Sequence, residues 1–106
     1  MVQQRRSGKL VRDKVPDTIR AAGGDPHTAL LGDEEYDLAL QSNLHEEIAK
    51  LLAAPEDERI EELADVVEVL YALAEHYGID WDAVESVGVT KKHEKGGFEG
   101  RVWLES

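Results

Sequence analysis

The chain has 106 residues, a net charge of −11 and no cysteine. This length predicts one domain with a thin core of its own, and the lack of cysteine excludes disulfides and thiolate metal sites. The acidic balance argues against a nucleic-acid polymer as partner. No apolar stretch approaches the roughly 20 residues needed to cross a bilayer, and the polar N-terminus is unlike a secretory signal. We therefore expect a cytoplasmic protein with no membrane partner.

Charge is distributed unevenly along the chain. Between Asp33 and Glu85 lie 17 acidic residues, with only Lys50 and Arg59 as cations. The other ten basic residues fall in the two terminal segments, 1–20 and 91–101. An acidic middle between basic ends suggests a site that first gathers cations and then holds a small anion. A solubilising acidic surface is the alternative.

Helix start and stop signals predict an all-α chain. We expect a disordered tail over residues 1–8 and one all-α domain over residues 9–106. The expected elements are, in chain order, a short helix from about Pro16 to Gly23, a connector over 25–32, long helices over 33–53, 56–77 and 81–95, and a candidate short strand over 102–104.

Aspartates and a proline mark the ends of the long helices. Asp33 is expected to cap the first of them and Asp80 the third, because aspartate is a favoured N-cap residue. Pro55 breaks the first long helix and opens the second. The first two long helices should therefore form a hairpin.

Carboxylates interrupt the apolar faces of this hairpin. At about 100° per residue, Glu47 falls inside the apolar face of the first helix. Glu62 falls inside the apolar face of the second, and Asp65 lies at its edge. A charged carboxylate on a buried face is costly unless a cation or a hydrogen-bond partner compensates it.

Folding the chain antiparallel about Pro55 sets position 47 level with position 63. Glu47, Glu62 and Asp65 should then converge at one height and repel one another. A hard divalent cation such as Mg²⁺, bound through oxygen, resolves that conflict. The alternative is that these acids pair with Lys or Arg across an interface.

The second long helix is apolar over nearly half of its circumference, more than two other helices and a short tail can cover. We therefore expect the hairpin and the third helix to complete their core in a homodimer or a larger symmetric oligomer.

The pair Glu46-Glu47, followed by the stretch Glu62-Leu63-Ala64-Asp65, resembles the all-α nucleotide pyrophosphohydrolase superfamily. That group includes MazG-like proteins, dimeric dUTPases and phosphoribosyl-ATP pyrophosphatases. Two end motifs, KLVRDKVP at 9–16 and KGGF at 95–98, are similar to a compact subfamily of predicted house-cleaning pyrophosphatases. The likeness covers roughly residues 9–105.

The resemblance implies a Mg²⁺-dependent enzyme, with Mn²⁺ as an alternative ion, that hydrolyses a nucleoside triphosphate to a monophosphate and pyrophosphate. Non-standard nucleotides are the expected substrates. Glu47, Glu62 and Asp65 would be metal ligands, and Glu46 a further catalytic acid that binds through water or orients the attacking water. The cations expected to hold phosphates are Arg12, Lys14, Lys92 and Lys95.

Lys50 departs from the family's first motif, which usually carries a third acid at this position. It lies on the same side of its helix as Glu47. It is expected to weaken the metal site, to contact a substrate phosphate or to mark a copy that binds without turnover. Two other functions therefore stay open, a phosphoribosyl-ATP pyrophosphatase and a non-catalytic helical dimer that binds a nucleotide or a protein.

Overall fold

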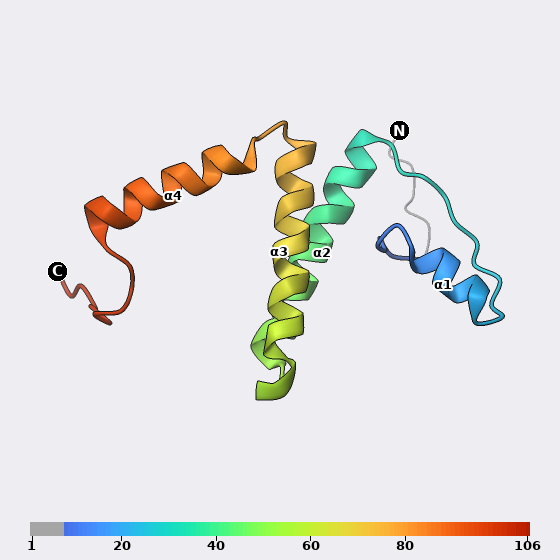
Figure 1. Ribbon diagram of the computed structural model, residues 1–106, viewed down its shortest axis with the longest axis horizontal. Helices are drawn as coiled ribbons and strands as arrows, with labels where there is room; N and C mark the ends of the chain where they lie inside the picture. The colour runs from blue at the N-terminus through green and yellow to red at the C-terminus, as the bar shows by residue number, and fades with distance from the viewer. Residues whose placement is uncertain (1–7) are drawn as a thin grey trace. The chain divides into compact units, whose positions relative to one another are not determined.

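The computed structural model describes residues 8–106, so the expected tail lies outside the described residues except for Gly8. Within this range the regular structure is helical throughout, and no strand is present. The prediction of an all-α fold is confirmed. The elements are α1 (Val15–Ala21), α2 (Asp33–Ala53), a 3₁₀ turn (Glu56–Glu58), α3 (Arg59–His76) and α4 (Trp81–Lys95), drawn in Figure 1.

The chain divides into two compact units, Met1–Leu70 and Tyr71–Ser106. The first unit holds α1, α2 and most of α3, and the second holds the end of α3 together with α4. In the second unit the rings of Tyr71 and Trp81 meet edge to face, with centroids 4.5 Å apart. That contact joins the last turns of α3 to the first turn of α4.

The end of α1 depends on two glycines. The amide of Gly23 bonds to the carbonyl of Arg20, and Gly23 has a φ of +92°, which favours glycine. A Cβ on Gly24 would lie 2.6 Å from the Cγ2 atom of Ile19. The chain can therefore turn tightly back against α1 only because these positions lack side chains.

The two expected aspartate caps differ in the structure. Asp80 is the N-cap of α4, and its carboxylate accepts a hydrogen bond from the amide of Asp82, so this prediction is confirmed. The Asp33 prediction is wrong by one residue, because Gly32 is the N-cap of α2 and Asp33 is the first helical residue. Asp33 instead joins two glutamates in the first turn, where negative charge interacts favourably with the helix dipole.

The expected strand over residues 102–104 is also wrong. Val102, Trp103 and Leu104 are 88%, 85% and 83% exposed, and residues 101–106 are irregular. A strand needs a neighbour to accept and donate its backbone hydrogen bonds. The described part of the chain contains no such strand.

Helices α2 and α3 run alongside each other in opposite directions, joined by the short segment around the 3₁₀ turn (Figure 1). Leu40 in α2 and Val66 and Val69 in α3 are buried in the core of the first unit. This arrangement brings the C-terminal half of α2 level with the first turns of α3. None of the described helices has the length and the apolar content to cross a membrane.

Candidate metal centre

Three carboxylates converge where α2 meets α3. Glu47 projects from α2, and Glu62 and Asp65 project from the N-terminal half of α3, about one turn apart. One oxygen from each of the three lies within 4.8 Å of the others. All three residues are partly buried. The structure thus brings together the carboxylates whose convergence the helical register predicts.

Two of these carboxylates each have an oxygen that makes no hydrogen bond. Glu47 Oε2 and Glu62 Oε2 are buried and lack a partner among residues 8–106. A buried acceptor without a partner costs about 1–3 kcal/mol, and more when it is charged. A cation with oxygen ligands removes this cost. The set of three carboxylates, with no nitrogen or sulfur donor, fits Mg²⁺ or Mn²⁺.

Arg12 reaches the carboxylates from the segment that precedes α1. Its Nη2 atom donates a hydrogen bond to Asp65 Oδ1 at 2.7 Å. The two side chains are 59% and 43% exposed, so their ion pair contributes little to stability. The guanidinium has five N–H donors. Arg12 therefore keeps donors for a further anion while it holds Asp65.

The segment that carries Arg12 is held on α2 by Asn43. The side-chain amide of Asn43 donates to the carbonyl oxygen of Leu10 at 3.4 Å, in a partly buried position. Asn43 is not among the residues that the sequence motifs predict for the site. A signal was present, because asparagine is unfavourable inside a helix and Asn43 precedes Glu47 by one turn.

Lys50 binds two carboxylates of its own helix. Its Nζ atom lies 3.4 Å from Glu46 Oε1 and 3.4 Å from Glu47 Oε1. The hydrogen bond to Glu47 and the charge of Glu47 are the main causes that raise the pKa of Lys50 above its usual value of 10.5. The stabilisation from these contacts is therefore present below pH 10.5 and is lost only as the pH rises through the raised pKa. Lys50 is a permanent cation at the edge of the cluster.

Glu46 and Lys14 are more exposed to solvent than the three clustered carboxylates. The side chain of Glu46 is 54% exposed, whereas that of Glu47 is only 13% exposed, so Glu46 lies on the solvent side of the pair. Lys14 is exposed at the N-cap of α1. No hydrogen bond or ion pair joins its side chain to another described residue, and its expected phosphate contact stays a prediction.

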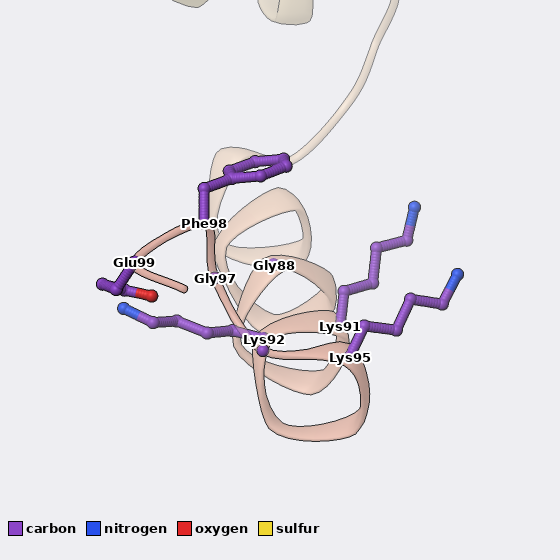
Figure 2. Close-up of a pocket in the computed structure, with 8 residues that line it drawn as sticks. Gly88, Lys91, Lys92, Lys95, Gly97, Phe98 and Glu99 are labelled. Atoms are coloured by element: carbon purple, nitrogen blue, oxygen red, sulfur yellow. The ribbon is translucent and has the colours of Figure 1, made fainter. Parts of the chain in front are cut away.

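Lys92 and Lys95 belong to the second unit, where they line an open hollow at the C-terminal end of α4. Figure 2 shows Lys91 and Lys95 extending on one side of the helix and Lys92 extending on the other. Phe98 also lines the hollow and is 97% exposed. Neither Lys91 nor Phe98 is among the site residues that the sequence predicts. The hollow is therefore lined by three lysines and an exposed aromatic ring.

Comparison with known proteins adds little to this geometry. No family model matches the chain, and no solved structure matches it. A protein of Mycolicibacterium smegmatis, described only as uncharacterized, is 50% identical over 46 residues. The match covers 43% of this chain and 47% of that protein, so the chain spans about half the length of the relative. These comparisons assign neither a family nor an activity.

Proposed function

We propose that the chain is a Mg²⁺-dependent nucleotide pyrophosphohydrolase that converts nucleoside triphosphates, non-standard ones in particular, to a monophosphate and pyrophosphate. The observation that carries the proposal is the pair of buried, unpartnered oxygens on Glu47 and Glu62, in a cluster that Asp65 completes. The motif resemblance and the nearby guanidinium of Arg12 support a phosphate substrate.

In this proposal the metal is held by Glu47, Glu62 and Asp65. When bound, Mg²⁺ lowers the pKa of a coordinated water and offsets negative charge on phosphate oxygens. Glu46, on the solvent side of the pair, orients the attacking water by accepting a hydrogen bond from it. Arg12 uses its free donors to hold a phosphate. Lys14, in the same unit as the cluster, is a further phosphate contact. The phosphate contacts expected from Lys92 and Lys95, in the second unit, stay predictions.

We also propose that the hairpin of α2 and α3 completes its core together with α4 in a symmetric assembly of identical chains. The described residues bury few large apolar side chains. Leu52 and Ile60 are 81% and 84% exposed, and Leu63, next to Glu62, is 52% exposed. Such a concentration of exposed apolar surface favours an interface over a free monomer.

One observation favours a second function. Lys50 already compensates Glu46 and Glu47 in part, as it would in a protein that binds a nucleotide without turning it over. Catalysis and binding without turnover predict different products, so a direct assay separates them.

The test is pyrophosphate release with Mg²⁺ across a panel of standard and non-standard nucleoside triphosphates and phosphoribosyl-ATP. Glu62→Gln should lower activity at least about 100-fold, since losing even a residue behind a metal ligand costs about 10–100-fold. Glu61→Gln is the matched control, because it makes the same charge change at an exposed neighbouring position of α3 and should stay active.

Two results would count against the proposal, the first against the role of the cluster and the second against catalysis. Unchanged activity in Glu62→Gln would remove the carboxylate cluster from the reaction. Nucleotide binding without any pyrophosphate release would favour the non-catalytic function. If phosphoribosyl-ATP were the sole substrate, the proposed metal-dependent hydrolysis would stand, but the proposed class of substrate would be replaced.

A further inference from the structure

The charged side chains at the carboxylate cluster do not cancel completely. Four carboxylates belong to the cluster and its edge, and two basic side chains bind three of them within 3.4 Å. Four negative and two positive charges leave a net charge of −2, which one divalent cation balances. The six residues are Glu46, Glu47, Glu62 and Asp65 as acids and Arg12 and Lys50 as bases.

We propose that Lys50 is a built-in cation that limits this site to one divalent metal ion. The inference rests on the proposed function and concerns the number of ions that the site accepts. The carboxylates of Glu46 and Glu47 are adjacent on α2 and would be the natural ligands of a second ion. The Nζ atom of Lys50 instead lies 3.4 Å from an oxygen of each.

The two oxygens of the Glu47 carboxylate have different surroundings. Its Oε1 atom faces Lys50, while its Oε2 atom is buried without a partner among the described residues. The first oxygen is already compensated and the second is not. A single ion bound through Glu47 Oε2, Glu62 and Asp65 therefore leaves the contact with Lys50 intact, whereas a second ion would have to displace it.

The position of Lys50 does not depend on a loop. It lies three and four residues after Glu47 and Glu46 in the same helix, a spacing at which side chains meet on the helix surface. Like charges at this distance repel, so the ammonium opposes a second divalent ion beside it.

The test is the number of Mn²⁺ ions bound per chain, measured by equilibrium dialysis and by electron paramagnetic resonance. Salt at 0.15 M screens weak binding to the exposed acids. The wild-type chain should bind one ion and give the signal of isolated Mn²⁺. Lys50→Glu should bind two ions and give the altered signal of two spin-coupled ions.

Lys50→Met distinguishes the effect of losing the positive charge from the effect of gaining carboxylate oxygens. It removes the ammonium and adds no oxygen, so it should also gain a second ion, bound more weakly than in Lys50→Glu. If Lys50→Met stays at one ion while Lys50→Glu reaches two, the added oxygens set the limit and the proposal is overturned. Lys91→Glu, with the same charge change on exposed α4, should stay at one ion.

The wild-type chain distinguishes the two proposals. Two ions per wild-type chain would overturn the role of Lys50 and leave the proposed function standing. A wild-type chain that binds no Mn²⁺ would overturn both. A second ion in Lys91→Glu would attribute the change to overall charge and would also overturn the role of Lys50. Circular dichroism checks that each variant keeps its helices.

Discussion

At the cluster, one short contact between side chains is expected to add little to the stability of the fold. Arg12 and Asp65 are joined by a short ion pair, yet both side chains are about half exposed. In water, such a pair contributes at most about 1 kcal/mol to folding. The ion pair instead fixes the position of the guanidinium beside the carboxylates that would bind a metal.

Arg12→Gln should therefore separate stability from binding. The free energy of unfolding in urea should fall by less than about 1 kcal/mol. Affinity for a non-hydrolysable nucleotide should fall by about 1.5–3 kcal/mol, the cost of losing a charged hydrogen bond. Calorimetric titration measures the second effect. Arg20→Gln is the control, because Arg20 forms a similarly exposed pair with Asp17 on α1; an equal loss of affinity there would contradict a specific role for Arg12.

The predicted and the observed helices differ at some of their ends and agree in their middles. The expected ends at Ala53 and Lys95 agree with α2 and α4. The expected second long helix begins instead with the 3₁₀ turn Glu56–Glu58 and becomes α-helical only at Arg59. Helix ends fray and their first or last turn is often 3₁₀, so predicted and observed bounds differ there by a residue or more.

The two aspartates that precede long helices provide a test at this scale. Asp80→Ala removes a side-chain cap and should cost about 1 kcal/mol of unfolding free energy. Asp33 makes no capping bond, so Asp33→Ala should lose only a favourable charge near the helix N-terminus, about 0.3–1 kcal/mol. Denaturant unfolding compares the two variants. A larger loss for Asp33→Ala would show that the cap of α2 is misassigned.

At the scale of the molecule, part of the candidate site is predictable from the sequence and part is not. Helical periodicity and one short connection fix the register of α2 and α3, so the convergence of Glu47, Glu62 and Asp65 follows from counting residues. The partner of Arg12 does not, because Asp65 is 53 residues away in the chain and only the folded path of the N-terminal segment joins them. Nor does the sequence show that one oxygen of Glu47 contacts Lys50 while the other is buried without a partner among the described residues.

Self-association is the whole-molecule prediction. The exposed apolar side chains near the start of α3 should pair with another copy, so sedimentation at micromolar concentration should show a species of at least twice the 11.8 kDa chain. Leu63→Gln should shift the equilibrium toward the monomer. Leu30→Gln should not, because Leu30 lies in the irregular connector before α2 and outside the hairpin that is proposed to form the interface. A compact wild-type monomer would contradict the proposal.

Anomalous diffraction from crystals of the wild-type chain soaked in Mn²⁺ would locate a bound ion directly. Mn²⁺ accepts the same carboxylate and water ligands as Mg²⁺ and can be located by its own scattering. The account predicts one strong peak between Glu47, Glu62 and Asp65, within coordination distance of all three. The same soak of Glu62→Gln crystals should lose this peak. Strong Mn²⁺ peaks elsewhere, with none among these carboxylates in the wild-type crystals, would contradict the account.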